Sequence, residues 1–340
     1  MFNARAPRGY SIAVNPVQPV MRRIDDFQQG HRPTAIAFGV VRKFGDDTAG
    51  NLAALITYYG FLSLFPLLLV MVTVLGLIAG GDPSLTKSIE HSALSQFPVI
   101  GTELGKNIHA LHRDSVISLV IGLVGLVWGS KGAVQTGQQA MADVWNIPTA
   151  ERPNFVTRTL RSLLMLVVLA VFLLASTAVA GFASFSKTIP GIAIAGSVLL
   201  ALVLNVVLYV LAFRILTPKA VPHRQLLPGA VLGGLIWTAL QYCGTLLVDH
   251  ELRGSNEVYG MFGVVLGLLA WIYMGSETTM YAAEVNVVYA RHLWPRSLVR
   301  PPLTGADRRV YSAISEQSRR RPEQRVDVSF TEAASRRPDS

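Results

Sequence analysis

The chain has 340 residues, of which 51% are hydrophobic and 15% are charged, whereas roughly 25% of the residues in a soluble domain are charged. Together with a mean hydropathy of +0.41, this composition excludes an ordinary water-soluble enzyme and indicates a membrane protein. The single cysteine, Cys243, excludes an intramolecular disulfide framework and a cysteine-based metal cluster.

Six apolar runs are long enough to cross a bilayer as helices, because a hydrocarbon core about 30 Å thick needs about 20 helical residues. Most of them are free of charged side chains, but the second carries Lys131. The sequence therefore predicts an all-α, polytopic membrane protein with six transmembrane helices. The predicted spans are Thr48 to Gly81, residues 115–134, Ser162 to Ser186, Thr188 to Phe213, Gln225 to Val248, and Val258 to Ser276 with a continuation toward Tyr289.

The net charge of +9 is distributed unevenly over the connecting segments. Basic residues concentrate before the first span, after the second, fourth and sixth spans, and are sparse in the other loops. Short basic segments stay in the cytoplasm, so both termini are predicted to be cytoplasmic, as an even number of spans requires. The predicted domains are an N-terminal cytoplasmic segment at 1–47 with a juxtamembrane helix, a six-helix transmembrane domain at 48–295 with an outer loop at 82–114, and a disordered basic cytoplasmic tail at 296–340.

Ionisable side chains in a membrane span are costly and usually face the protein interior or a water-filled cavity. Glu277 and Glu284 are seven residues apart, on one face of the last helix. Lys131 is a candidate counter-charge for either glutamate, because burying all three charges unpaired would be prohibitive. In the alternative interpretation, Lys131 extends to the membrane interface and Glu284 lies at the headgroup level beside Asn286.

Polar residues and a proline interrupt the first span. Pro66 removes a helical hydrogen bond and predicts a kink. A kink beside polar side chains often marks a cavity, although proline kinks that serve packing are at least as common. The candidate intramembrane polar site therefore combines residues of the first, second and last helices, namely Tyr58, Tyr59, Ser63, Lys131, Glu277, Glu284 and Asn286.

Three GxxxG pairs lie in the second, fifth and sixth spans. Such pairs let helix backbones approach closely, either within one bundle or between copies of the chain. Packing within the bundle is the simpler interpretation, and a homo-oligomer stays open. The pairs are Gly125 with Gly129, Gly229 with Gly233, and Gly263 with Gly267.

Several short motifs are distributed over residues 35–295. They are TYYGFLSLFPL at 57–67, Val144-Trp145 followed by Arg152-Pro153, Pro228-Gly229-Ala230, Tyr259-Gly260, Trp271-Ile272-Tyr273, and Ala283-Glu284 with Asn286. In combination they resemble the YihY/BrkB family of bacterial inner-membrane proteins, formerly labelled ribonuclease BN. Ala142 and Ala282 depart from the family pattern, which often has asparagine before its tryptophan and usually has glycine before Ala-Glu.

The resemblance implies a six-helix protein of the bacterial inner membrane from a family with suggested links to lipid or glycolipid export and serum resistance. Its older nuclease label finds no support in the residues, because the cytoplasmic loops are short and basic and hold no metal-binding, Walker-type or Ser-His-Asp pattern. We therefore expect no enzyme activity, no cofactor and no metal site.

Two classes of function remain. In the first, the protein is a transporter or flippase-like protein for an amphiphile, with the two glutamates binding a proton or cationic group, Lys131 meeting a phosphate and the paired tyrosines lining the path. In the second, it is a membrane scaffold or regulator whose basic tail recruits a cytoplasmic partner. The expected partners are membrane lipids and a second copy of the chain, without specific nucleic-acid binding.

Overall fold

The computed structural model describes residues 17–78, 115–185, 190–218, 220–251, 260–298 and 303–330. Within these residues the chain is helical and contains no strand, which confirms the all-α prediction. The predicted outer loop at 82–114 lies outside the described residues.

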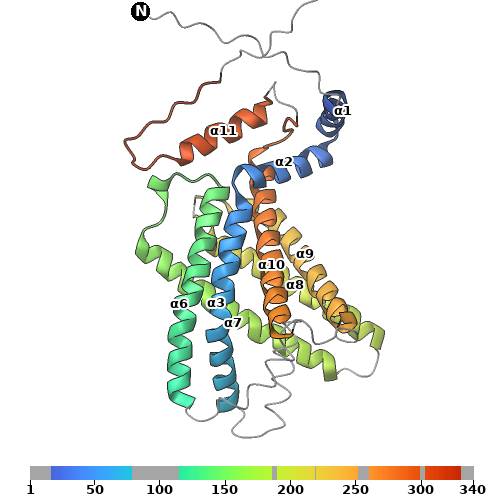
Figure 1. Ribbon diagram of the computed structural model, residues 1–340, viewed down its shortest axis with the longest axis vertical. Coiled ribbons are helices and arrows are strands. Elements are labelled where there is room, and N and C mark those ends of the chain that lie inside the picture. Colours follow the sequence, from blue (N-terminus) through green and yellow to red (C-terminus); the bar gives the residue numbers. More distant parts are fainter. Residues whose placement is uncertain are drawn as a thin grey trace, which may run out of the picture.

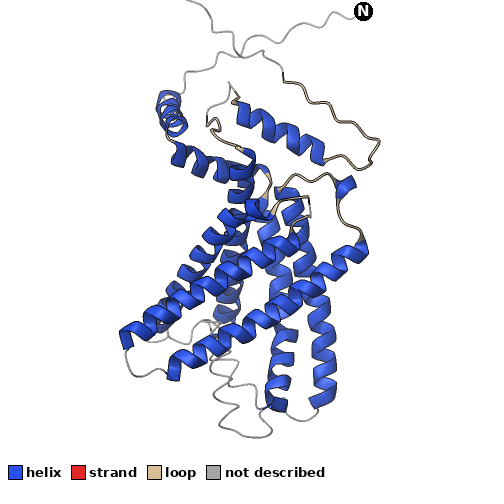
Figure 2. Cartoon of the chain, turned by 180° about the vertical axis from the view of Figure 1, so that it is seen from behind, coloured by secondary structure: helices blue, strands red, loops and turns tan. Residues whose placement is uncertain are grey.

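Long helices form a bundle in which each helix packs against its neighbours in the chain and the last closes against the first (Figures 1 and 2). The chain alternates in direction, so the starts of three helices and the ends of the other three share one end of the bundle. We call this the capped end, because shorter helices lie over it: α1 (Val17–Gly30), α2 (Arg32–Asp46) and α11 (Gly305–Gln317). The bundle helices are α3 (Ala49–Ile78), α6 (Ser115–Val144), α7 (Phe155–Phe185), α8 (Pro190–Leu216), α9 (Leu227–Glu251) and α10 (Gly260–Arg291).

Prolines and side-chain caps set several of these helix starts. Pro190 and Pro228 lie in the first turns of α8 and α9, where the missing N–H is not needed for a helical bond. The Asn154 side chain accepts a hydrogen bond from the backbone N–H of Thr157 (3.0 Å) and so caps α7. Apolar runs that follow these signals then continue as helices for 25 to 31 residues.

Three of the described helices are long and apolar enough to cross a membrane, over Phe155–Ser176, Gly196–Leu216 and His223–Gly244, and Ala49–Leu64 is a shorter apolar stretch. Much of their surface is not covered by protein; Leu160, for example, is 66% exposed. Soluble proteins rarely expose a continuous apolar face of this kind, whereas helices that contact lipid do.

The most completely buried side chains gather at the capped end. They include Trp145 at the end of α6, Phe213 near the end of α8, and Met280 and Val287 on α10. Among the described side chains, these pack the helix ends together where the polar connecting segments also converge.

The helix α11 corrects one prediction, because it lies inside the segment 296–340 that composition marked as disordered. Thr304 starts α11 with a capping box: its hydroxyl accepts the Asp307 N–H (3.1 Å), and the Asp307 carboxylate accepts the Thr304 N–H (3.0 Å). Ala306 and Val310 are buried on one face of the helix. The low average hydropathy of the long tail concealed this short amphipathic helix.

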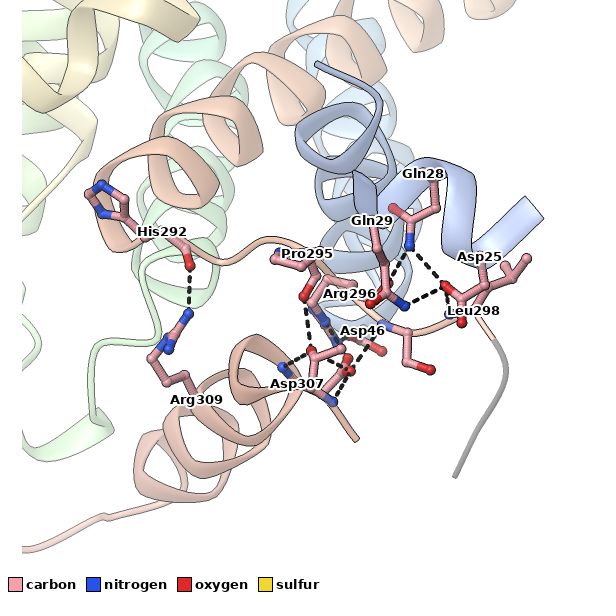
Figure 3. Close-up of polar contacts among 12 residues, drawn as sticks. Asp25, Gln28, Gln29, Asp46, His292, Pro295, Arg296, Leu298, Asp307 and Arg309 are labelled. Carbon is pink, nitrogen blue, oxygen red and sulfur yellow. Dashed lines mark hydrogen bonds and ion pairs between the residues drawn. The ribbon is translucent and has the colours of Figure 1, made fainter. Parts of the chain in front are cut away.

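Arg296 connects the short helices to one another at the capped end. Its guanidinium donates from Nε to Asp307 (2.5 Å) and from Nη2 to Asp46 of α2 (2.7 Å), and both Arg296 and Asp307 are fully buried (Figure 3). The Gln28 side chain of α1 donates to the Arg296 carbonyl oxygen (2.7 Å). One arginine thus holds α1, α2 and α11 to the segment that follows α10.

We expect Asp307→Asn to release α11 from the capped end. The substitution leaves the Arg296 charge buried without its main partner, which typically costs about 3–5 kcal/mol. The measurement is amide hydrogen exchange of the peptide that contains residues 305–317, which should become fast in the variant. Asp327→Asn, at an exposed position, is the matched control, and equal exchange in both variants would contradict the role of the ion pair.

The same contact should be sensitive to acid. Burial alone would raise the pKa of Asp307, but the hydrogen bonds from Arg296, Ser297 and Thr304 outweigh it and lower the pKa below its ordinary value of 3.8. A lowered pKa in the folded state contributes stability that is complete above the ordinary value and is lost as the pH falls through the lower one. Protection of α11 should therefore be constant at neutral pH and decline below about pH 4.

Candidate functional site

Glu284 is a buried carboxylate on α10, near the capped end. The residue is 0% exposed, and no described group donates to either of its oxygens in hydrogen-bonding geometry. The ammonium of Lys43, on α2, pairs with it through charge alone, with 3.9 Å between Nζ and Oε2. Because a buried charge without hydrogen bonds destabilises a protein interior, such a group is a candidate for function rather than for stability.

Lys43 is held in place by two other groups. Its ammonium donates to the carboxylate of Asp47, one helical turn further along, and to the carbonyl oxygen of Val144 at the end of α6 (3.1 Å). The Lys43 residue is itself completely buried. The lysine therefore joins α2, α6 and α10. Glu284 is attracted by the charge of the Lys43 ammonium but accepts no hydrogen bond from it.

The buried cluster of Lys43, Asp47 and Glu284 contains one group that can be positive and two that can be negative. Burial raises the pKa of Asp47 above its ordinary value of 3.8, although the Lys43 ammonium acts in the opposite direction. Asp47 and Glu284 also lie close enough to interact directly. The single ammonium offsets only one of the two negative charges that the carboxylates can carry.

A cavity of about 400 Å³ lies beside this cluster at the capped end. Its wall includes the carboxylates of Asp46, Asp47 and Asp143, the guanidinium of Arg152 and the side chain of Gln317 from α11. Asp47 belongs both to the cavity wall and to the buried cluster. The cavity and the buried cluster are therefore adjacent, with Asp47 between them.

Thr48 forms the turn that positions Asp47 between α2 and α3. Its φ of 51° places a β-branched residue in the left-handed region, which costs roughly 1–2 kcal/mol. The turn is held by hydrogen bonds from the Thr48 N–H to Gly45 (3.1 Å) and from the Asn51 N–H to Thr48 (2.9 Å). Strained residues of this kind are concentrated at functional sites.

Lys131 lies elsewhere, so the predicted pair of Lys131 with Glu284 is wrong. Its ammonium lies over the ring of Phe155 at the start of α7, 4.9 Å from the ring centroid, and Glu284 pairs with Lys43 instead. Glu277 is half-buried on α10, and no ion pair with Lys131 is found among the described residues. Glu284 is fully buried by protein near the capped end, and the alternative that places it at the headgroup level stays a prediction.

The polar residues of the first predicted span do not join the buried cluster. Tyr58 is exposed on α3, and its ring contacts that of Tyr59 edge to face. Tyr59 packs against α6 at Gly132, and the Ser63 hydroxyl donates to the Gly60 carbonyl oxygen of its own helix (2.7 Å). Around Pro66, α3 continues as a helix on both sides.

Asn286 caps the start of α9 with its side-chain oxygen. Its Oδ1 accepts the backbone N–H of Gly229 (2.6 Å), a donor in the first helical turn that has no partner within its own helix. A Cβ on Gly229 would lie 1.9 Å from the Ala282 carbonyl oxygen, and one on Gly233 would lie 2.7 Å from the Tyr209 ring. This GxxxG pair therefore lies at the crossing of α9 with α10 and α8.

The other predicted glycines are less informative. A Cβ on Gly125 would lie 3.2 Å from the Pro66 ring, so this glycine lies at the contact between α6 and α3. Gly129 is in α6, and Gly263 and Gly267 are in α10.

Lys43 and Asp47 are the site residues that sequence reasoning missed. They lie in the predicted juxtamembrane segment, where a lysine among apolar residues is typical of a helix at the membrane interface. The usable signal was their spacing of four residues, which places them on one face of a helix. Their link to Glu284 spans about 240 positions of the chain and has no local signature.

Comparison with known proteins supports one assignment. The family model described as Virulence factor BrkB matches residues 40–301. The chain is 25% identical over 289 residues to UPF0761 membrane protein of Alcanivorax borkumensis. This alignment covers 82% of the present chain and 65% of the Alcanivorax protein. The chain is also 26% identical over 262 residues to Inner membrane protein YhjD of Escherichia coli. This second alignment covers 71% of the present chain and 77% of YhjD. No solved structure matches the chain significantly.

The matched region contains every residue of the buried cluster and its cavity except Ile314, Gln317 and Ser318, which lie at the end of α11 and directly after it. The alignment spans just under two thirds of the Alcanivorax protein's own length. The apolar, protein-free faces of α7, α8 and α9 agree with the membrane location that the relatives' names state. The chain is therefore an integral membrane protein that belongs to the Virulence factor BrkB family.

Proposed function

We propose that the protein is a multi-pass protein of the bacterial inner membrane that moves a lipid or another amphiphile across or within the bilayer. In this proposal the chain crosses the membrane six times, with the capped end and both termini in the cytoplasm. The high density of arginine and lysine in the segments at the capped end supports this orientation. The helices α3, α6 and α10 have 30, 30 and 32 residues, which is long enough to span a bilayer.

The observation that carries the proposal is the fully buried Glu284 carboxylate beside a cavity that holds Asp47. A carboxylate that gains or loses a proton changes the charge of the cluster, and hence the relative stability of two arrangements of the helices that Lys43 joins. We assign Glu284 and Asp47 as the proton-binding groups and Lys43 as the group that transmits their state to α2, α6 and α10. The amphiphile itself moves along the exposed apolar helix faces, and no step requires a cofactor, a metal or enzyme chemistry.

A second candidate function is a membrane scaffold or regulator that does not transport. The feature that favours it is α1, where Ile24 and Phe27 are exposed apolar residues on a helix that is clamped to the capped end. Exposed apolar side chains on a short helix are typical of a surface that binds a partner protein.

The test is transbilayer movement of labelled lipids in liposomes that contain the purified full chain, with and without a proton gradient. We expect movement above that of protein-free liposomes, and we expect Glu284→Gln to reduce it toward the protein-free level. Glu277→Gln and Lys131→Ala are the matched controls and should retain movement, because neither residue belongs to the buried cluster. Absence of movement for every lipid tested, under both conditions, would favour the scaffold.

A further inference from the structure

A second, smaller cavity at the capped end is lined by basic rather than acidic side chains. It has a volume of about 70 Å³ and lies between the end of α6, the start of α7 and the end of α8. Arg152, Arg158 and Arg161 line it together with Gln138, and no aspartate or glutamate belongs to its wall. A cavity needs roughly 10–15 Å³ to hold one water molecule. A cavity of about 70 Å³ therefore has room for one tetrahedral phosphate group.

The positive charge in this cavity is only partly compensated. Arg152 pairs with Asp143 (2.6 Å), but within the described residues neither Arg158 nor Arg161 forms an ion pair. Among the described residues, the Arg161 guanidinium donates one long bond, to the Thr217 carbonyl oxygen (3.4 Å), and it lies near enough to Arg214 for the two charges to repel. An anion in the cavity would offset this repulsion and would find two guanidinium groups with free donors.

Gln138 positions the wall of the cavity. It is 6% exposed, and its Nε2 donates to the Arg158 carbonyl oxygen (3.1 Å) and the Ser162 hydroxyl (3.1 Å). These two bonds tie α6 to the turn of α7 that carries Arg158 and Arg161, so the two guanidinium groups project from a segment that is fixed to its neighbour.

The helix that carries the cavity also has exposed apolar surface. Phe155, Val156 and Leu160 are exposed apolar residues of α7, the helix that supplies Arg158 and Arg161. At 100° per residue, Val156 and Leu160 lie on the side of α7 away from Arg158, so they set the level of the cavity along the bundle without forming its wall. The geometry points to a binding site for a phosphate group, as in the headgroup of an anionic phospholipid, at Arg158 and Arg161. The site is independent of whether the protein transports lipid.

The test is native mass spectrometry of the purified full chain in detergent with dioleoyl phosphatidylglycerol or dioleoyl phosphatidylcholine. We expect the anionic lipid to be retained in preference to the zwitterionic one. Loss of two charge-assisted contacts in Arg158→Gln/Arg161→Gln should weaken this retention about ten-fold or more. Arg224→Gln/Arg320→Gln removes the same charge at exposed positions and should leave retention unchanged.

A second arm separates a lipid headgroup from free phosphate. Inorganic phosphate is added at constant ionic strength, and both lipid displacement and the thermal unfolding midpoint are followed. Stabilisation by phosphate that needs Arg158 and Arg161, without preferential retention of phosphatidylglycerol, would support the phosphate site with free phosphate as its source. Arg158→Lys/Arg161→Lys keeps the charge but loses the planar guanidinium groups, so it should bind phosphate and the anionic lipid more weakly than the wild type. This variant replaces the glutamine double variant if the latter does not fold. The proposal would be overturned if the control Arg224→Gln/Arg320→Gln weakened lipid and phosphate binding as much as Arg158→Gln/Arg161→Gln does.

Discussion

Replacing Gly229 by alanine should prevent α9 from packing against α10 and should strongly destabilise the protein. The added Cβ would lie 1.9 Å from the Ala282 carbonyl oxygen and 2.7 Å from the side-chain amide of Asn286. The first of these atoms is backbone and cannot rotate away, so the two helices must separate. Overpacking of this kind costs about 1–3 kcal/mol or more, and separation also breaks the 2.6 Å bond from Gly229 to Asn286.

The measurement for Gly229→Ala is the thermal unfolding midpoint in detergent. Gly196→Ala is the matched control, because nothing lies within 4 Å of the position of its Cβ on α8. In that helix interior alanine is intrinsically preferred over glycine, so the control should melt at or slightly above the wild-type temperature. Similar midpoints for the two variants would show that the crossing of α9 and α10 is wrong.

Replacing Lys43 by methionine should have the second large effect on stability. The substitution keeps most of the side-chain volume but removes the ammonium that faces both Asp47 and Glu284. Removal of one partner from a buried ion pair typically costs about 3–5 kcal/mol, because the other charge is left buried. Lys131→Met is the matched control and should cost less than about 1 kcal/mol, since the Lys131 ammonium lies over the exposed ring of Phe155 and forms no ion pair among the described residues.

A double variant shows whether the loss arises from the buried carboxylates. Lys43→Met/Glu284→Gln removes one of the two charges that the first substitution leaves without a partner. The double variant should therefore be more stable than Lys43→Met alone, and the deviation from additivity measures the coupling of the two residues. Additive effects would show that Lys43 and Glu284 do not interact, and a larger loss for Lys131→Met than for Lys43→Met would contradict the observed cluster.

The helical architecture was predictable because its signals are local. Uninterrupted apolar runs specify long helices, and Pro190, Pro228 and Asn154 mark where helices begin. Glu284 and Asn286 could be selected from the sequence because polar groups within an apolar helix must find partners. Which partners they find depends on how the helices are arranged, and that information is spread over the whole chain.

The two errors have a common cause. Lys131 was preferred as the counter-charge because it lies inside an apolar run, whereas Lys43 lies before the first span in a segment of mixed composition. The tail was predicted to be disordered for a similar reason, since its average polarity masks the capping box at Thr304 and the buried ion pair of Asp307 with Arg296. In both cases short segments outside the bundle pack against it through single charged contacts, which composition does not reveal.

In the proposed function, Glu284 serves proton binding at the expense of stability. In the observed cluster it is the carboxylate without a hydrogen-bond donor among the described residues, while Lys43 and Asp47 form a pair without it. Glu284→Gln keeps the shape of the side chain and removes the charge, so the protein should become equally or more stable. If the protein is instead a scaffold, Glu284→Gln should leave both partner binding and the distribution of lipids between the two leaflets unchanged.

The most direct measurement is therefore a comparison of the thermal unfolding midpoint and the rate of transbilayer lipid movement for the wild type and Glu284→Gln, on the same purified samples. We predict an unchanged or raised midpoint together with loss of lipid movement in the variant. A lowered midpoint with lipid movement retained would contradict the account, because it would make Glu284 a structural residue.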